Sequence, residues 1–383
     1  MQLSLELEYW TVDTTGALAP AQPVIERIDA IDAESADPML EVVTEPCDDV
    51  AELQAEVTER LCEVLAVAHE EDRRLVPLAT PLCAESIDTS ECPRTRIQRR
   101  VLGEEFGNAT RCAGTHLHID QISGSETDQL NLLTALDPAF ALVASSSHDR
   151  GEYVAGCARS AIYRRGCYGD HPELGRLWPY AGSVDEWEDR IDRTFDRFRR
   201  QALATDVDPA TFDDHFAPED SLWTPIRLRE TFGTIEWRAP DVTLPVETLQ
   251  LVRDVRDAMD RVVDRGLEIG HRPGIAGERV TIPEFDRLGR HVRTAMDSGI
   301  ESPAVGGYLE AMGFDPTDYD PVAREFDGVT SLSTTDAERL RLRYADRLER
   351  EVDALATERE AGRPAVSHTK DLRRVSPLRG RIS

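Results

Sequence analysis

The sequence predicts an α+β fold: a curved, largely antiparallel β-sheet with helices packed on its outer face and a charged concave surface on the other side. Two observations lead to this prediction. Four strand-like segments alternate apolar with ionisable residues, and amphipathic helical patterns separate them along the chain. Because strand side chains have a period of two, each segment has one apolar face and one charged face. The apolar faces would pack on the helices, and the charged faces would share one surface.

The ionisable residues of these segments are mostly acids and histidines, whereas ordinary exposed strand faces carry Thr, Lys, Ser and Gln. In residues 3–9, Glu6 and Glu8 have the same parity. The other segments contribute Glu41 and Glu45 from residues 40–45, His116, His118 and Asp120 from residues 114–120, and Glu236 and Arg238 from residues 233–238. Like charges this close raise each other's pKa unless a positive group neutralises them. The strands therefore predict a bound cation.

Helical periodicity is clearest after Asp48 and Asp49, an N-cap region. Apolar residues recur on one stripe from Val50 to Ala68, which predicts a helix to about residue 73. Further helices are predicted at residues 127–146, 184–203, 246–270, 281–297 and 334–360. No internal repeat or low-complexity tract divides the chain. Residues 1–360 are therefore expected to form one domain, followed by a loose tail at 361–383.

The composition is strongly acidic and almost free of lysine. Asp and Glu number 73 against 44 Lys and Arg, the formal net charge is −29, and Lys370 is the only lysine. Nucleic acids and anionic membranes would repel such a surface, so neither is expected as a partner. The composition suits a cytoplasmic protein in molar salt, where the Debye length falls to about 3 Å. An acidic mesophilic protein with GC-rich codons is the alternative.

Other sequence features agree with a cytoplasmic location. There is no run of 18 apolar residues and no secretory leader, so we expect neither a membrane span nor export. The seven cysteines include no C-x-x-C pair. This pattern predicts reduced thiols and not a zinc site.

Each charged position also has an ordinary explanation. Glu6 and Glu8 could be surface residues, His116 could be a core histidine, and Glu236 could simply pair with Arg238. Taken together, carboxylates and a histidine around a wet floor suit Mg²⁺ or Mn²⁺, hard cations that prefer oxygen ligands. A zinc hydrolase is the competing hypothesis, but the chain has no H-E-x-x-H helix and its carboxylates outnumber its histidines.

The common phosphate-binding motifs are absent. Asp371 follows Lys370, which excludes a Walker A motif, and no G-x-G-x-x-G follows a strand. A phosphorylated ligand would have to be held by cations and by arginine, whose planar fork grips two oxygens at once. The candidates are Arg238, Arg227, Arg150, Arg159, Arg164 and Arg165, with a second cluster at Arg94, Arg96, Arg99 and Arg100.

Five segments, in this order, resemble the glutamate–cysteine ligase family. They are the E-L-E strand, LEVVTEP, GTHLHID, ASSSHDRGEYVAGCARSAIYRR and FGTIEWRAPDV, all within residues 3–260. The E-x-E pair and the GTIEWRAPD block are the most specific of them. The most similar branch is that of the carboxylate–amine ligases, which includes haloarchaeal-type glutamate–cysteine ligases.

The resemblance implies a glutamine synthetase-like core, in which a curved antiparallel sheet carries helices outside. It implies that residues 1–360 form the catalytic domain of an ATP-dependent ligase. Such an enzyme joins the γ-carboxylate of L-glutamate to the amine of L-cysteine through a γ-glutamyl phosphate. The substrates would be ATP, L-glutamate and L-cysteine, with Mg²⁺ or Mn²⁺ as cofactor. A homo-oligomer is compatible with the resemblance.

The resemblance also implies a ligand set for the metal, which falls on Glu6, Glu8, Glu41, His116 and Glu236. The catalytic arginine that meets the transferred phosphate falls on Arg238. The arginine that engages glutamate falls on Arg159, and Arg227 and Arg150 are further candidates for binding substrate. His118 would support the ligands from behind.

This chemistry predicts the surroundings of the site. Metal ions must cancel the repulsion between ATP and the substrate carboxylate, so the glutamates are expected on an open floor and not in a core. The loops at 147–183 are candidate lids that would exclude water from the acyl phosphate. No motif demands cysteine, so a ligase for another amine is an alternative. A non-catalytic metal- or nucleotide-binding protein and a divalent-metal hydrolase are the remaining hypotheses.

Overall fold

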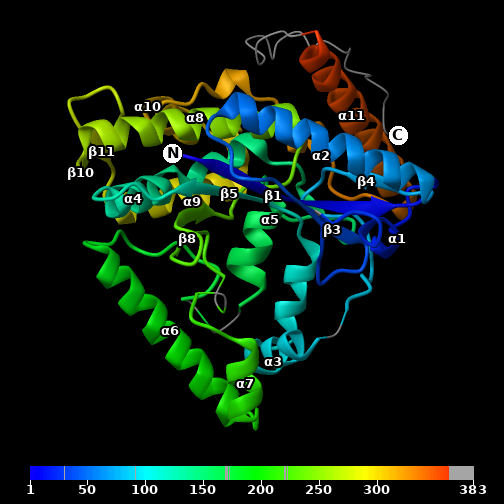
Figure 1. Ribbon diagram of the computed structural model, residues 1–383, viewed down its shortest axis with the longest axis horizontal. Coiled ribbons are helices and arrows are strands. Elements are labelled where there is room, and N and C mark those ends of the chain that lie inside the picture. Colours follow the sequence, from blue (N-terminus) through cyan, green and yellow to red (C-terminus); the bar gives the residue numbers. More distant parts are fainter. Residues whose placement is uncertain are drawn as a thin grey trace.

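The computed structural model describes residues 1–29, 31–90, 92–168, 171, 173–219, 221 and 223–361 (Figure 1). Its main feature is an open seven-stranded sheet of order β2-β3-β1-β5-β9-β8, in which β4 also pairs with β1. All of its pairings are antiparallel, which confirms the predicted fold class. The strands are β1 (Leu3–Val12), β2 (Ile31–Ala33), β3 (Met39–Val43), β4 (Arg74–Val76), β5 (Thr115–Asp120), β8 (Ile226–Arg229) and β9 (Thr234–Trp237).

The apolar face of the sheet contributes to the main hydrophobic core. On β1, Leu3, Leu5 and Leu7 are buried and alternate with the acidic positions. Burial of each such side chain contributes about 1.5–3 kcal/mol. Helices α2 (Val50–Glu70), α8 (Pro245–Arg265) and α11 (Thr334–Glu360) lie above the sheet in Figure 1, and α4 (Glu126–Leu136) packs against α8, β8 and β9. The expected outer helical layer is therefore present.

The charged side of the sheet is covered as well, which the sequence analysis did not foresee. Figure 1 shows four helices below the sheet: α3 (Pro93–Leu102), α5 (Ala158–Ala161), α6 (Val184–Ala204) and α7 (Pro209–His215). Helices α3, α6 and α7 share a second buried apolar cluster that includes Phe198 and Phe212, together with Phe106 of the 3₁₀ helix Glu104–Arg111. This lower layer surrounds the space in front of the charged face.

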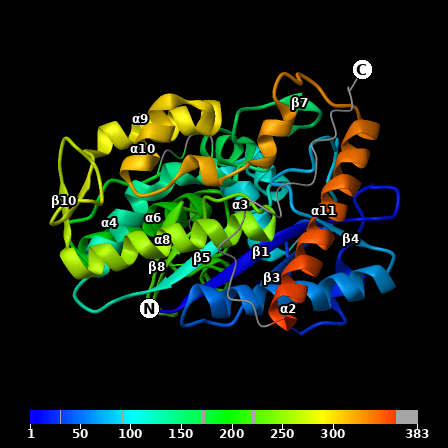
Figure 2. The same ribbon diagram turned by 90° about the horizontal axis from the view of Figure 1, so that it is seen from above.

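The remaining elements are small and lie at the periphery. They are α1 (Gln22–Ile25), α9 (Phe285–Ser298), α10 (Pro303–Ala311), the hairpin β6 (His148–Asp149) and β7 (Glu152–Tyr153), and the parallel pair β10 (Leu267–Ile269) and β11 (Val280–Ile282). Seen from above in Figure 2, α8 lies between α2 and the α9–α10 pair.

The predicted helices are present, with shifts at their ends that have local causes. The side chain of Asp49 accepts hydrogen bonds from the first turn of α2, as an N-cap should. Helix α4 ends at Leu136 and a 3₁₀ segment follows, because Pro138 has no N–H to continue the helix. Helix α8 ends at Arg265, five residues earlier than predicted, and is followed by Gly266, whose φ of +72° suits glycine. Helix α9 begins only at Phe285, because residues 280–282 form β11.

Three further expectations concern the tail, membrane-spanning helices and the cysteines. Apart from Ala361, the tail predicted to be loose lies outside the described residues. Within the described ranges, no helix is both long and apolar enough to cross a membrane. All seven cysteines are unpaired.

Candidate active site

Strand register gathers the predicted residues into one charged row. Residues directly opposite each other in antiparallel strands project from the same face of the sheet. The opposed pairs are Glu8–Glu41, Glu6–His116, His118–Glu236 and Glu236–Arg227. The row therefore crosses five neighbouring strands, β3, β1, β5, β9 and β8, and brings together segments more than 200 residues apart in sequence.

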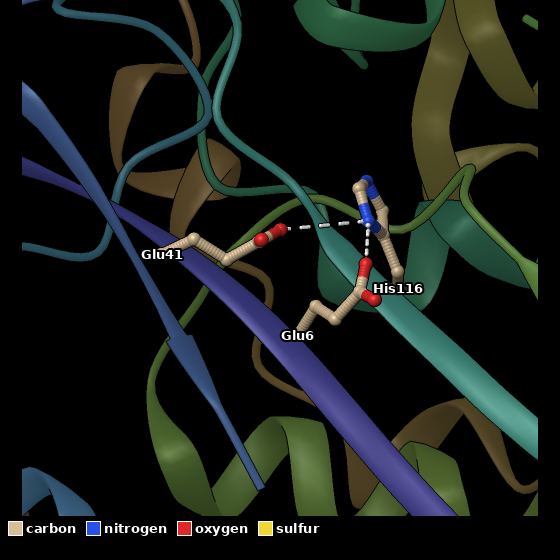
Figure 3. Close-up of side chains that lie close together, drawn as sticks. All are labelled: Glu6, Glu41 and His116. Carbon is tan, nitrogen blue, oxygen red and sulfur yellow. Dashed lines mark hydrogen bonds and ion pairs between the residues drawn. The ribbon is translucent and has the colours of Figure 1, made fainter. Parts of the chain in front are cut away.

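The centre of the row is the group Glu6, Glu41 and His116, which points inward from three neighbouring strands (Figure 3). Glu6 Oε2 lies 2.7 Å from His116 Nδ1, and Glu41 Oε1 lies 3.8 Å from the same nitrogen. Because an ionised carboxylate only accepts hydrogen bonds, Nδ1 donates and Nε2 keeps its lone pair. Candidate ligand atoms of the three side chains lie within 4.8 Å of one another, close enough to share one cation.

A second group of possible ligands consists of Glu6, His118 and Glu236. His118 Nε2 lies 3.3 Å from Glu6 Oε1 and 4.0 Å from Glu236 Oε1. Arg238 donates a hydrogen bond to Glu236, and Arg229 Nη1 lies 3.4 Å from its other oxygen. Glu6 is thus common to two ligand groups, while Glu236 links the ligands to arginine.

A third group contains Glu8, Glu34 and Glu41, and Glu34 was not among the predicted site residues. Glu34 follows β2, where Asp32 lies opposite Glu41. The sequence held a signal for it, since Glu34 shares the parity of Asp32. It was missed because β2 has only three residues, too few to show a clear alternation.

Arg229 is the other residue near the row that the sequence analysis did not single out. It lies two positions after Arg227 on β8 and therefore projects from the same face. A strand prediction for residues 226–229 would have found it.

Two of the acids, Glu8 and Glu236, do not lie on an open floor, so that expectation is wrong for them. Glu236 is 1% exposed and Glu8 is 6% exposed, and His116 is buried as well. The reason is the lower layer: residues of α3, of the 3₁₀ helix Glu104–Arg111 and of the segment around Tyr163 lie across the charged face. The site is a partly covered chamber, in which Glu6 and Glu41 keep some exposure, and two cavities adjoin it.

Burial and crowding shift the pKa values of the acids in opposite directions. Burial raises the pKa of Glu8 to about 8, helped by Glu34, and burial together with Glu6 raises the pKa of Glu41 to about 10. Burial also acts on Glu6, but the adjacent His116 and His118 lower its pKa below the usual range. Burial of Glu236 is likewise outweighed, chiefly by Arg238, and its pKa is lowered.

These features fit divalent cations such as Mg²⁺ or Mn²⁺. Two acids that hold protons at neutral pH would ionise readily beside a cation, since metal binding displaces protons. His116 Nε2 is buried, has no hydrogen-bond partner among the described residues, and lies 3.5 Å from Glu8 Oε1. Each of the three groups is dominated by carboxylate oxygen, which favours these cations over zinc.

Two cavities adjoin the row from different sides. The larger, of about 490 Å³, is lined by Glu8 and Glu34 together with Arg227 and Arg238. Aromatic walls close it, formed by Phe106, Tyr163, Tyr168 and Trp223. The smaller, of about 250 Å³, is lined by Glu6 and His118 and by Phe232 at the β8–β9 turn.

The predicted arginines are placed in different environments. Arg238 and Arg227 lie in the chamber and line the larger cavity. Arg159 is 1% exposed, and its Nη1 donates to the carbonyl oxygens of residues 238, 239 and 240. Arg150 pairs with Asp149 and Asn108, so the structure does not bring it into the row.

The remaining arginine candidates include two that are engaged elsewhere. Arg164 makes two hydrogen bonds to the buried Asp137, and Arg165 pairs with Asp297. Of the cluster at residues 94–100, Arg94 lines the larger cavity.

The candidate lid at 147–183 is only partly described, since residues 169, 170 and 172 lie outside the described ranges. Within it, Tyr163, Tyr168 and Leu174 line the larger cavity. The segment therefore borders the chamber, and its role as a lid stays a prediction.

Comparisons with known proteins point in one direction. No family model matches the chain. A protein of Streptomyces avermitilis, provisionally named glutamate–cysteine ligase 2-1, is 24% identical over 265 residues, which cover 68% of this chain and 66% of that protein. The match thus spans just under two thirds of that relative's own length.

Solved structures agree at the level of the fold. The glutamate–cysteine ligase of Francisella tularensis, solved in complex with AMP, gives a TM-score of 0.54 with 13% identity and 97% of each chain covered. A bifunctional glutathione synthetase of Pasteurella multocida gives a TM-score of 0.50 with 15% identity, and the match covers 92% of this chain but 52% of that one. The predicted resemblance is confirmed: in sequence and in fold, the chain is similar to glutamate–cysteine ligases.

Proposed function

We propose that the protein is an ATP-dependent ligase that joins the γ-carboxylate of L-glutamate to the amine of L-cysteine. One observation carries the proposal: Glu6, Glu8, Glu41, His116 and Glu236 converge in one chamber, with Arg238 beside them and a cavity on either side. The reaction needs such a chamber, because two anionic reactants must meet in it.

Divalent cations would be held by the three ligand groups described above, in which carboxylates supply the oxygen ligands and His116 and His118 supply the nitrogen ligands. When bound, Mg²⁺ or Mn²⁺ would neutralise the phosphate oxygens of ATP and align its γ-phosphate with the acceptor. Arg238 lies close enough to Glu236 to remain oriented in the absence of substrate. Its guanidinium would meet the charge that develops on the transferred phosphoryl group.

The smaller cavity suits the nucleotide. Phe232 is 61% exposed, its ring lies 4.9 Å from the Arg229 guanidinium, and the cavity that it borders also contains Glu6 and His118. A flat, exposed ring next to candidate metal ligands matches a molecule with a planar base and a polyphosphate. We therefore place the adenine at Phe232 and the triphosphate toward Glu6.

The larger cavity suits the two amino acids. Arg227 and Arg238 offer guanidinium groups for carboxylates, and Glu34 and Glu8 would attract ammonium groups. The walls of Tyr163 and Trp223, stacked at 4.4 Å, would keep water from the γ-glutamyl phosphate. In the first step, a γ-carboxylate oxygen attacks the γ-phosphorus and ADP leaves. In the second, the amine nitrogen attacks the carbonyl carbon, phosphate leaves and the nitrogen loses a proton.

The choice of L-cysteine rests on the resemblance and on the acidic, lysine-poor composition, which is typical of proteins in molar salt. A ligase that uses another amine is the second candidate, since the larger cavity has room for a bigger side chain. We propose residues 1–360 as the catalytic unit and, because the substrates are intracellular, a cytoplasmic location.

An amine panel tests the proposal. The purified protein is incubated in concentrated KCl with Mg²⁺, ATP and L-glutamate, and phosphate release and γ-glutamyl products are measured with each amino acid. We expect the highest rate and a γ-glutamylcysteine product with L-cysteine. Turnover with a different amine would favour the second candidate. Phosphate release without glutamate would indicate a hydrolase, and no turnover with any amine would contradict a ligase.

A further inference from the structure

Arg159 is a buried guanidinium whose hydrogen bonds go to the backbone. Its Nη1 lies 2.8 Å from the carbonyl oxygen of Arg238, 3.1 Å from that of Ala239 and 3.2 Å from that of Pro240. These carbonyls follow directly after β9, the strand that carries Glu236. A charged donor shared by three consecutive carbonyls holds this segment more tightly than neutral hydrogen bonds would.

Gly114 leaves the space that this guanidinium occupies. A Cβ atom at Gly114 would lie 2.1 Å from Arg159 Nη2 and 2.3 Å from Cζ, distances that no side chain tolerates. Gly114 also bonds Glu8 twice: its N–H donates to the Glu8 carboxylate, and its carbonyl accepts from the Glu8 N–H at 3.0 Å. The same glycine therefore contacts both Arg159 and Glu8.

We propose that Arg159 and Gly114 form a clamp that sets the positions of Arg238 and Glu8, so that Arg159 is a positioning residue and not a glutamate-binding one. The inference rests on the proposed function. Arg159 is not one of the described residues that line the two cavities. Tyr163, which does line the larger cavity, has its ring centroid 5.1 Å from Arg159 Cζ.

The clamp joins two parts of the chamber that the sheet does not connect directly. Arg238 comes after the end of β9, and Glu8 lies on β1, with β5 between them. Asp241, the next residue after the clamped carbonyls, accepts from the backbone N–H of Ser145 at 2.8 Å and fixes the far end of the segment.

Two variants test the clamp from opposite sides. Arg159→Lys keeps the charge but loses the fork, and Gly114→Ala keeps Arg159 but pushes its guanidinium aside. Arg164→Lys is the matched control, because Arg164 is also buried but bonds Asp137. For each protein, kcat and KM for L-glutamate are measured with Mg²⁺-ATP, Mn²⁺ affinity is measured by calorimetry, and thermal unfolding gives the folded fraction.

We expect both clamp variants to lower kcat per folded molecule by about a hundredfold, the loss typical of a reactive group misplaced by about 1 Å, with KM for glutamate nearly unchanged. Gly114→Ala should also weaken Mn²⁺ binding, because Glu8 moves. Arg164→Lys should lose only stability.

A large rise in KM for glutamate with kcat preserved in Arg159→Lys would overturn the proposal in favour of direct substrate contact. Unchanged kcat per folded molecule and unchanged Mn²⁺ affinity in both variants would also overturn the proposal, because Arg159 and Gly114 would then contribute only to the fold. If Arg159→Lys does not fold, the kcat and the Mn²⁺ affinity of Gly114→Ala test the proposal. A wild-type protein that binds Mn²⁺ but does not turn over would instead count against the proposed function, and the calorimetric comparison would still test the clamp.

Discussion

Glu6 and His116 lie directly opposite each other on the antiparallel strands β1 and β5, with 2.7 Å between Glu6 Oε2 and His116 Nδ1. The other Glu6 oxygen lies 3.3 Å from His118 Nε2. One carboxylate thus touches both histidines and belongs to two ligand groups. The two histidines lower the pKa of Glu6, whereas burial raises the pKa of Glu8 and of Glu41.

Glu8→Gln should abolish metal-dependent ATP turnover while the fold is kept. The amide is isosteric but cannot provide the anionic oxygen that a hard cation needs. We expect a loss greater than the roughly 10–100-fold typical of groups behind a ligand. Phosphate release and circular dichroism measure the two properties, and Glu45→Gln, which changes an exposed acid just after β3, is the control. Near-normal turnover would refute the assignment of Glu8 as a ligand.

Arg238→Lys should reduce turnover more than nucleotide affinity. A lysine keeps the charge but cannot reach two phosphoryl oxygens at once, so the loss should appear in kcat, by about a hundredfold. Steady-state kinetics and ATP titration separate the two effects. Arg256→Lys on the outer helix α8 is the control. Equal losses in affinity and turnover would mean that Arg238 mainly binds the ground state.

Glu34→Gln should weaken cation binding, although sequence patterns did not single out this residue. Its carboxylate lies in a ligand group with Glu8 and Glu41, and we expect Mn²⁺ affinity to fall by about 10–100-fold. Calorimetric titration with Mn²⁺ gives the affinity directly. If Glu34→Gln binds Mn²⁺ as well as Glu45→Gln does, Glu34 is not a ligand.

Phe232→Ala should raise KM for ATP by about tenfold, the size expected from the loss of one base–aromatic stack. KM for glutamate should stay the same, because glutamate is assigned to the other cavity. Phe232→Trp should restore the wild-type value, and Ile269→Ala, another exposed apolar residue, is the control. A change in KM for glutamate alone would reverse the assignment of the two cavities.

Stability without divalent cations should fall as the pH rises from about 6.5 to 8.5. Between the pKa of an acid in the unfolded chain, 4.5, and the raised values of about 8 for Glu8 and about 10 for Glu41, the folded state binds more protons than the unfolded state. Stability contributed by a raised pKa is complete below the unfolded value and is lost as the pH rises toward the folded value. His116, with a pKa lowered by burial to about 4, acts only below this range.

Thermal unfolding with and without Mg²⁺ measures this dependence. The Mg²⁺-induced rise in Tm should grow with pH, because fewer protons then compete for the carboxylates. A Tm that is independent of pH, together with no response to Mg²⁺, would contradict the assignment of these acids as cation ligands.

The sheet and its charged face could be predicted because both depend on local pattern. Alternation in residues 3–9 and 114–120 gives each residue its face, whatever the neighbouring strand is. The helices at 50–70, 184–204 and 334–360 were predicted nearly to the residue, since their caps and apolar stripes are local too.

Glu34, Arg229 and the partly covered chamber depended on contacts between distant segments. β2 is too short to show a period, and the cover over the acids comes from α3 and from residues near Tyr163. For Arg159, the resemblance implied contact with glutamate, and that contact stays a prediction: its Nη1 donates to three carbonyls, while its Nε and Nη2 have no hydrogen-bond partner among the described residues. The sequence shows which charge and hydrogen-bonding groups a side chain carries, but packing decides which partner it binds.

By itself, the sequence determined which residues share a face, which helices form and which chemistry the acids, histidines and arginines can support. These properties follow from backbone periodicity and from the side chains themselves. Only the tertiary structure decided that Glu8 and Glu236 are buried, that the acids divide into three overlapping groups near two cavities, and that Arg159 Nη1 bonds to the backbone. Those outcomes depend on distances between segments far apart in the chain, which strand register and helix packing set.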